Sequence, residues 1–210
     1  MNSRRNRVDK KDSLEKGHEA ENSFAEIAGK KGWEVIPAPR NSDIHEHWDF
    51  LLKKGEKEYK VDVKARKRIK RSNASVQDKW LWIELHGVRE DEPGWLYGSK
   101  ADLIAFETKN SFVIAPRTEL IELVHKLVDF NSLASRPEDA RYKIYSRSGR
   151  HDKITLIETE KLKAVKFFEW SKDLFHQTFQ VSKPWKVYDK MSGNYWPPFE
   201  ERRFYHIYNR

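Results

Sequence analysis

The chain has 210 residues, and its 41 Lys and Arg against 33 Asp and Glu give a formal net charge of +8. Hydrophobic residues make up 38% and charged residues 35%, which indicates a compact core beneath a heavily charged surface. The absence of cysteine excludes disulfides, thiolate metal sites and cysteine nucleophiles. No apolar run approaches the roughly 20 residues of a spanning helix, and no secretory signal is recognisable. We therefore expect a protein of the cytoplasm, or of the host cytoplasm if the chain is viral, without a membrane partner.

The excess of positive charge favours a polyanionic partner, because Lys and Arg that neutralise phosphates release condensed counterions. Charge alone leaves simple solubility as the alternative. Residues 1–12 contain Arg4, Arg5 and three further basic residues with almost nothing apolar. This composition predicts a flexible basic arm.

A helix is expected next, from a capping box at Asp12 and Glu15 to a stop at Gly32. Within it, Glu21 lies on the same face as Phe24. A carboxylate on the packing face of a helix is costly unless it has a partner. Glu21 is therefore a candidate functional residue, with a helix-edge side chain reaching solvent as the alternative.

Two-residue alternation of apolar side chains then predicts a series of short strands, some of them joined as hairpins. The expected strands are 33–36, 47–52, 59–65, 80–86, 103–106, 112–115, 143–145 and 154–157, and helices are expected over 118–130 and 159–164. This order predicts an α/β or α+β sandwich. A core of residues 13–130 would be followed by an aromatic and basic C-terminal extension, 131–210, packed on it.

One hairpin of this series carries the residues with the clearest chemistry. If it turns about Gly55 and Glu56, facing residue numbers sum to 111, and Asp49 lies opposite Asp62. Facing residues have Cβ atoms about 5 Å apart, and two carboxylates this close repel each other unless a cation lies between them. Oxygen ligands of this kind suit Mg²⁺ or Mn²⁺.

Lys64 lies two residues beyond Asp62, on the same face of the strand. A lysine there is placed to orient a nucleophilic water or to neutralise a phosphate in the transition state. A bound divalent ion would lower the pKa of that water and stabilise charge on phosphoryl oxygen. These parts together indicate metal-assisted phosphodiester hydrolysis, and the alternative is a surface hairpin with ordinary ion pairs.

Five residues, taken in chain order, carry a resemblance to a known family. They are Glu21 on the first helix, Asp49 at a strand end, and Asp62, Val63 and Lys64 on the next strand. This order resembles the signature of the PD-(D/E)XK nuclease superfamily. The Gly17-x-x-x-Glu21 opening is similar to that of archaeal-type Holliday junction resolvases. The segment Trp82-x-Glu84, followed by residues 94–98 and 101–106, looks like phage-encoded relatives.

The resemblance implies a restriction-endonuclease-like core, with a central mixed sheet flanked by helices. It implies that Asp49, Asp62 and the Val63 carbonyl bind Mg²⁺ or Mn²⁺, with Glu21 as a further ligand, direct or through water. It also implies that Lys64 acts with the three carboxylates in catalysis. The implied reaction is DNA hydrolysis, with Holliday junctions or other branched DNA as the substrate. Symmetric cuts in a four-way junction call for a two-fold enzyme, so we expect a homodimer.

A basic cluster follows Lys64 directly. It consists of Arg66, Lys67, Arg68, Lys70 and Arg71, and with Arg4 and Arg5 it is expected to contact the DNA backbone. Such contacts would position the DNA without reading its sequence. A solvated loop is the alternative.

Other interpretations stay open. His45, His47 and Asp49 spell the HxHxD opening of a zinc hydrolase motif, although Phe50 stands where that motif has another His. Glu84 could reach the metal site from the next strand or be a solvated carboxylate. A non-catalytic DNA-binding or packaging accessory protein would use the same basic segments, and a restriction-type endonuclease would cut linear duplex at a defined sequence.

Overall fold

The structure, a computed structural model, describes residues 3–70, 72–173, 187–189 and 194–196, and the side chains of residues 15–70 and 72–173. The chain divides into two compact units, Met1–Lys172 and Asp173–Arg210. We describe each unit by itself. Within the described residues, no helix has the length and apolar character needed to cross a membrane.

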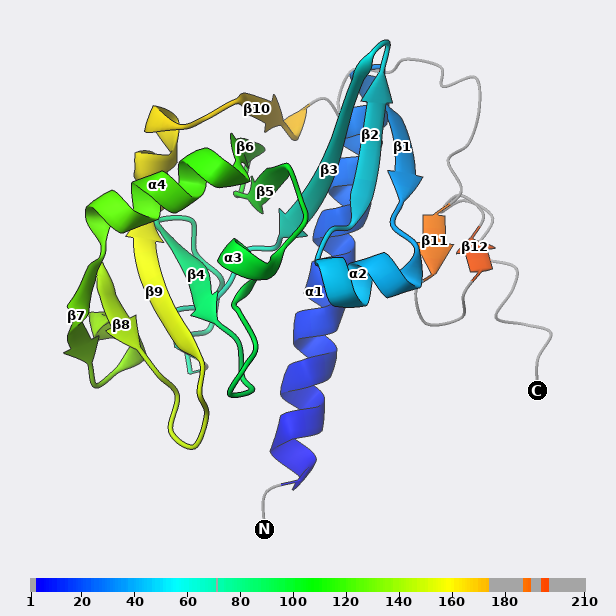
Figure 1. The fold of residues 1–210 in the computed structure, drawn as a ribbon. Helices are drawn as coiled ribbons and strands as arrows, with labels where there is room; N and C mark the ends of the chain where they lie inside the picture. The colour runs from blue at the N-terminus through cyan, green and yellow to red at the C-terminus, as the bar shows by residue number, and fades with distance from the viewer. Residues whose placement is uncertain (1–2, 71, 174–186, 190–193, 197–210) are drawn as a thin grey trace, which may run out of the picture. The chain divides into compact units, whose positions relative to one another are not determined.

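The first unit contains a sheet of six strands in the order β1-β2-β3-β5-β6-β10 (Figure 1). These strands are β1 (Glu34–Pro37), β2 (Phe50–Lys54), β3 (Lys57–Lys64), β5 (Leu103–Glu107), β6 (Ser111–Pro116) and β10 (Phe168–Ser171). The β3–β5 pair is parallel and the other pairs are antiparallel. The sheet is therefore mixed, as predicted.

A second sheet of four strands follows the order β4-β9-β8-β7. The strands are β4 (Trp80–His86), β7 (Asp129–Ala134), β8 (Lys143–Tyr145) and β9 (Lys153–Glu158). Because β4 pairs with β9, and β10 pairs with β6 of the first sheet, the compact unit continues past the boundary expected at residue 130. Much of the expected C-terminal extension is thus an integral part of the core.

The helices flank the first sheet on both sides (Figure 1). They are α1 (Ser3–Lys30), α2 (Arg40–Glu46), α3 (Trp95–Gly98) and α4 (Arg117–Leu127), with 3-10 turns η1 (Pro137–Asp139) and η2 (Thr159–Ala164). On one face, Phe24 of α1 packs on Phe112 and Trp170, with ring centroids 5.4 and 5.3 Å apart. On the other, Phe106 shares a core with Leu120 of α4 and with residues of β4 and β9.

Several elements differ from the sequence-based expectations. The helix expected over 118–130 ends at Leu127, and α2, α3, β7 and β10 were not expected. The first helix begins at Ser3, so most of the segment expected as a flexible arm is helical, because Arg and Lys favour helix and neither Gly nor Pro occurs between Ser3 and Lys16. The side chains of Arg4 and Arg5 lie outside the described part. The strand expected over 47–52 begins only at Phe50, because α2 ends at Glu46 and His47, the residue that caps it, has a left-handed backbone conformation (φ 53°) that a strand does not contain.

The second unit contains an antiparallel pair of short strands, β11 (Val187–Asp189) and β12 (Asn194–Trp196). The rest of the expected C-terminal extension from residue 174 lies outside the described residues.

Candidate active site

The hairpin formed by β2 and β3 has the predicted register. Phe50 pairs with Val61 and Lys54 with Lys57, so facing residue numbers sum to 111 as expected. The Asp49 N–H also donates to the Val61 carbonyl, at 2.8 Å, so the sum of 111 holds from Phe50 onward and the pairing shifts by one residue at Asp49. The Asp49 carboxylate nevertheless lies close enough to Asp62 for its charge to act on the Asp62 pKa. The predicted proximity of the two carboxylates is therefore confirmed.

Both carboxylates of this pair are buried, with 7% of Asp49 and 4% of Asp62 exposed. Asp49 Oδ2 accepts a hydrogen bond from the Val63 N–H at 2.7 Å. Asp62 Oδ2 lies 2.6 Å from Lys64 Nζ, but the angles are not those of a hydrogen bond, so among the described residues this buried oxygen has no hydrogen-bond partner. Burial, helped by the nearby Asp49, raises the pKa of Asp62 to about 7, while Lys64 opposes the rise.

Strand alternation places these groups on the side of the sheet away from α1. Val61 and Val63 join the core beneath α1, so Asp62 and Lys64 point to the opposite face. There Lys64 Nζ lies 4.7 Å from the centre of the Trp95 ring, a cation–π contact. The lysine is thereby held between a carboxylate and an aromatic ring.

The position of Trp95 depends on Gly94, the residue before α3. A Cβ at Gly94 would lie 2.3 Å from the Glu84 carbonyl oxygen, so only glycine permits this approach to β4. The Gly94 N–H donates to the Leu85 carbonyl at 3.2 Å. The backbone of β4 therefore fixes where α3 begins and where Trp95 meets Lys64.

The second sheet adds charged groups to this site. Burial raises the pKa of Glu84 on β4, against the opposing charges of Lys64, Lys67 and Arg147. Lys67 is exposed as a residue, and its ammonium interacts electrostatically with these groups. Burial, followed by repulsion from Lys64, lowers the pKa of Lys67, while Glu84 and Asp62 oppose the change. Glu84 is therefore one of the site's neighbours rather than a fully solvated carboxylate.

The basic cluster is not a uniform patch of solvated cations. Arg66 pairs with Asp78, and Lys70 pairs with Glu138. The mutual repulsion of the basic side chains is therefore reduced in part by carboxylates of the protein itself. From the sequence alone, DNA phosphates are expected in this role. Arg68 packs against the second sheet, and its Nε is buried without a hydrogen-bond partner within the described part of the chain. Arg71 lies outside the described residues.

Glu21 approaches the sheet from its other side. It lies on α1, whose Phe24 packs with Val61 on the face opposite to Asp62, and it forms an ion pair with His18 at 3.5 Å. Across the described residues, no group of three or more His, Asp or Glu side chains is close enough to hold a metal ion. The structure thus brings Asp49 and Asp62 together but adds neither Glu21 nor the histidines of the HxHxD motif to them.

The Asp49–Asp62 pair nevertheless has the donor chemistry of a magnesium site. Mg²⁺ keeps several waters and is commonly bound through one or two carboxylates. Two buried carboxylates, one with an oxygen that lacks a hydrogen bond, and the backbone carbonyl of Val63 fit this pattern.

Two further charged residues near Glu84 were not singled out in the sequence. They are Arg147 and Asp152, which lie in the loop between β8 and β9. The only feature of the sequence that points to this loop is Gly149, a turn residue between them. That signal locates the loop but does not indicate which of its charged side chains faces the site.

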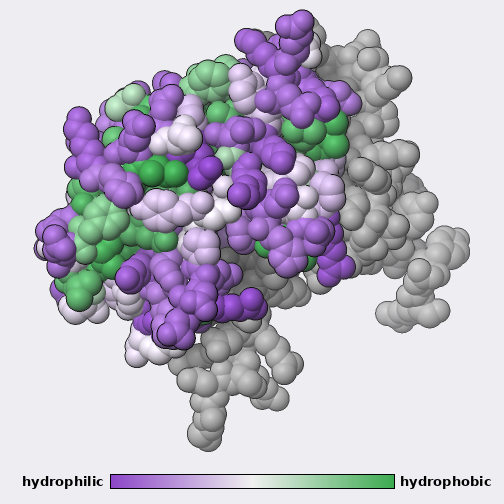
Figure 2. All heavy atoms as spheres, viewed as in Figure 1, coloured by the Kyte–Doolittle hydropathy of each residue, from purple (hydrophilic) through white to green (hydrophobic). Residues whose placement is uncertain are grey.

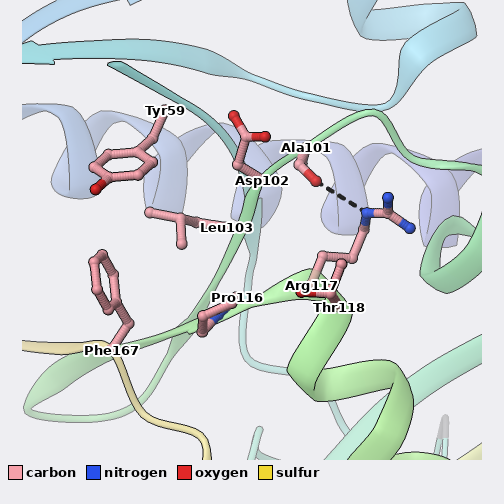
Figure 3. A pocket seen from close by; sticks show the side chains of 8 residues that line it. All are labelled: Tyr59, Ala101, Asp102, Leu103, Pro116, Arg117, Thr118 and Phe167. Carbon is pink, nitrogen blue, oxygen red and sulfur yellow. Dashed lines mark hydrogen bonds between the residues drawn. The ribbon is translucent and has the colours of Figure 1, made fainter. Parts of the chain in front are cut away.

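A separate cavity of about 270 Å³ lies near the start of β5 and contains none of the predicted site residues (Figure 3). Arg117 reaches across it and donates from Nε to the Ala101 carbonyl at 2.9 Å. Asp102 accepts the Lys60 N–H at 2.8 Å. These polar groups connect β3, β5 and α4, so we assign them a structural role.

Comparisons of this chain with protein-family models, with curated proteins and with solved structures gave no match.

Proposed function

We propose that this protein is a metal-dependent endonuclease that hydrolyses DNA phosphodiesters, with a core of the PD-(D/E)XK type. The observation that carries the proposal is the buried Asp49–Asp62 pair, with Lys64 adjacent on the same strand face. Paired carboxylates beside a lysine are what phosphodiester hydrolysis requires: a cation site, and a positive group at the reacting phosphate.

Each of these residues has a role in the proposed reaction. Asp49, Asp62 and the Val63 carbonyl would hold Mg²⁺ or Mn²⁺, which when bound supplies an acidified water and stabilises charge on phosphoryl oxygen. Lys64 orients the attacking water and neutralises the pentacoordinate phosphate, and Trp95 restricts where the ammonium can move. Attack of the water oxygen on phosphorus breaks the bond to the 3′ oxygen; the water loses a proton and the leaving 3′ oxygen gains one, so the products are a 3′-hydroxyl and, as the family resemblance implies, a 5′-phosphate.

The finer proposal is a structure-specific enzyme that cuts Holliday junctions or other branched DNA as a homodimer. The net charge of +8 and the placement of Lys67 beside the site support a polyanionic substrate. The branch specificity and the dimer come from the family resemblance of the motif. The resemblance also implies Glu21 as a ligand, but α1, which carries it, packs on the face of the sheet opposite to Asp62, so we leave Glu21 out of the proposed metal site.

The decisive experiment is a cleavage assay on a labelled four-way junction, a matched linear duplex and a single strand. Each substrate is incubated with Mg²⁺, Mn²⁺ or EDTA. We expect Lys64→Ala to lower the cleavage rate about a thousand-fold while DNA binding persists. The matched control is Lys53→Ala on the same hairpin, whose ammonium pairs with Glu58 at 2.7 Å away from the site. It should cut at the wild-type rate.

The outcomes separate the alternatives. Paired cuts near the branch, lost in EDTA and in Lys64→Ala, support the resolvase. Cuts in every substrate keep the nuclease and remove the junction specificity, and sequence-defined cuts in duplex indicate a restriction-type enzyme. If DNA is bound equally with and without metal but never cut, the catalytic proposal is wrong and the accessory binding protein replaces it.

A further inference from the structure

One face of the second sheet meets the loop that leaves β3. The register aligns Glu84 of β4, Ile154 of β9 and Tyr145 of β8 in one row, and side chains in a row share a face of the sheet. Trp82 is on the same face, two residues before Glu84, and its indole N–H donates to the Arg68 carbonyl at 3.0 Å. The loop from the proposed catalytic strand therefore crosses the face that carries Glu84.

The loop between β8 and β9 continues this row of side chains. Asp152 lies two residues before Ile154 and Arg147 two residues after Tyr145, so alternation continued past the strand ends places both on the Glu84 side. In Figure 1 this loop lies beside the β4–α3 loop, and the His151 N–H donates to the Val88 carbonyl at 3.4 Å. Figure 2 shows that this end of the second sheet is strongly hydrophilic.

Arg147 is held in place at several points. Asp152 is completely buried, accepts the Arg147 N–H at 3.2 Å through Oδ1, and pairs with its Nε through Oδ2. The Arg147 carbonyl accepts the Arg150 N–H at 3.1 Å, which closes a tight turn. A carboxylate buried this completely fixes a guanidinium more firmly than a surface ion pair does. The arginine is thus oriented before any ligand arrives.

The charge of this fixed arginine acts on the proposed active site. It opposes the rise that burial causes in the pKa of Glu84, and it contributes to the lowered pKa of Lys67, after burial and Lys64. Its side chain remains 35% exposed. A guanidinium has five N–H donors, and the pair with Asp152 engages its Nε. A partly exposed, oriented guanidinium whose charge acts on Lys67, and which shares the neighbour Glu84 with Lys64, suits an anionic ligand.

We propose that Arg147 is a substrate-binding residue that contacts a backbone phosphate of the nucleic acid, next to the phosphate served by Lys64, and that Asp152 positions it. The proposal rests on the proposed function, because it names a further part of the substrate that the same site holds. Its consequence is a path for the substrate strand between the loop after β3 and the loop between β8 and β9. Arginine suits this role because its planar fork matches phosphate oxygens.

The test measures binding and cleavage in the full-length protein. Binding of labelled four-way junction and linear duplex is measured in EDTA over a series of KCl concentrations, and cleavage is measured in Mg²⁺. We expect Arg147→Ala to raise Kd about tenfold, to reduce the slope of log Kd against log salt by about one, and to lower kcat/KM at least tenfold. The matched control is Arg150→Ala, an exposed arginine of the same loop, which should change Kd less than twofold.

Removing Arg147 alone leaves the Asp152 carboxylate buried without its partner, so a second variant protects the test against unfolding. The double variant Arg147→Met with Asp152→Asn removes both charges and keeps the approximate volume. It should fold like the wild type in circular dichroism and still show the reduced salt slope. Arg147→Lys should recover part of the binding, because it restores the charge without the fork.

The results distinguish the role proposed for Arg147 from the proposed catalytic function. If the wild type cleaves DNA while the double variant and Arg147→Ala behave like Arg150→Ala, Arg147 is purely structural and this inference is wrong. If the wild type binds DNA through Arg147 but never cleaves it, the inference stands and the proposed catalytic function fails. If the wild type neither binds nor cleaves DNA, both are wrong.

Discussion

Two buried aspartates, Asp152 in the β8–β9 loop and Asp62 on β3, each lie beside a cation but have different partners. Asp152 is 0% exposed and receives both the backbone N–H and the Nε of Arg147. Asp62 is 4% exposed, contacts Lys64 without hydrogen-bond geometry and has a second carboxylate, Asp49, next to it. The first carboxylate is satisfied by the protein, and the second is not.

The difference lies in the local balance of charge. We call Asp152 the anchor of Arg147, because its carboxylate is fully paired with that arginine. Around Asp152 one carboxylate meets one guanidinium, whereas at Asp62 two carboxylates share the Lys64 ammonium. A buried charge without full compensation costs several kcal/mol. A protein retains such an arrangement where a ligand supplies the missing positive charge. The pairing pattern therefore supports the proposal that a cation binds at Asp62 and not at Asp152.

The largest expected effect is the loss of the anchor. Asp152→Ala should lower the free energy of unfolding by about 3 kcal/mol, because a buried pair with two donors is broken. Urea unfolding at pH 7 measures this change. The control is Asp139→Ala, which removes an exposed carboxylate paired with Arg136 at 2.9 Å and should cost less than about 1 kcal/mol. Equal effects of the two substitutions would remove the distinction between the anchor and a surface pair.

The opposite sign is expected at Asp62. The pKa of this carboxyl is raised from 3.8 to about 7 in the folded chain, so the wild type loses stability as pH rises through that interval. In EDTA at pH 8, Asp62→Asn should therefore raise the free energy of unfolding by about 2 kcal/mol. At pH 4 the difference should nearly vanish. Urea unfolding at the two pH values checks this, and a destabilised variant at pH 8 would contradict it.

Metal binding should compensate the same carboxylate. At ten times its Kd, Mg²⁺ should stabilise the wild type by about 1.4 kcal/mol, which corresponds to a rise in Tm of roughly 3 °C for a chain of this size. Thermal unfolding with and without Mg²⁺ measures the shift. Asp62→Asn should show almost none of it, whereas Asp139→Ala should retain all of it. A shift that persists in Asp62→Asn would place the ion elsewhere.

The smallest effect concerns the basic cluster after β3. Lys67→Ala should weaken DNA binding about fivefold, because its ammonium lies beside the site, where it is near Lys64 and Glu84. Lys70→Ala should change binding less than twofold, because Lys70 already pairs with Glu138. Fluorescence anisotropy at fixed salt compares the two variants. Equal losses would show that the internal ion pair does not restrict Lys70.

Local patterns were sufficient to predict most strands and the hairpin register. The turn at Gly55 and the alternation from Tyr59 to Lys64 specify which residues face each other, and those residues are close in sequence. Two of the elements that were not predicted lack a comparable local signal. The helix α2 has only seven residues and buries none of them, so it lacks an apolar face. The strand β10 pairs with β6, which lies far from it in the chain.

The residues of the candidate site likewise fall into those predictable from local patterns and those brought together by contacts distant in sequence. Asp49, Asp62 and Lys64 belong to one hairpin, so their proximity followed from its register. Arg147 and Asp152 lie near Glu84 only because β9 pairs with β4, and sequence spacing contains no information on that pairing. The ion pairs of the basic cluster have the same origin, since Glu138 lies far from Lys70 in the chain.

The pairing of β4 with β9 also determines when the site can form during synthesis and folding. Trp80 pairs with Glu158, so the strand that carries Glu84 has no neighbour in its sheet until the chain has been made that far. Closing so long a loop costs entropy before any contact compensates it, and contacts of high sequence separation slow folding. A nascent or truncated chain that ends near residue 130 contains Asp49 and Asp62 but lacks β8, β9 and the loop between them, which lie beside Glu84 in the complete chain. Complete synthesis through β9 is therefore a precondition for an assembled site.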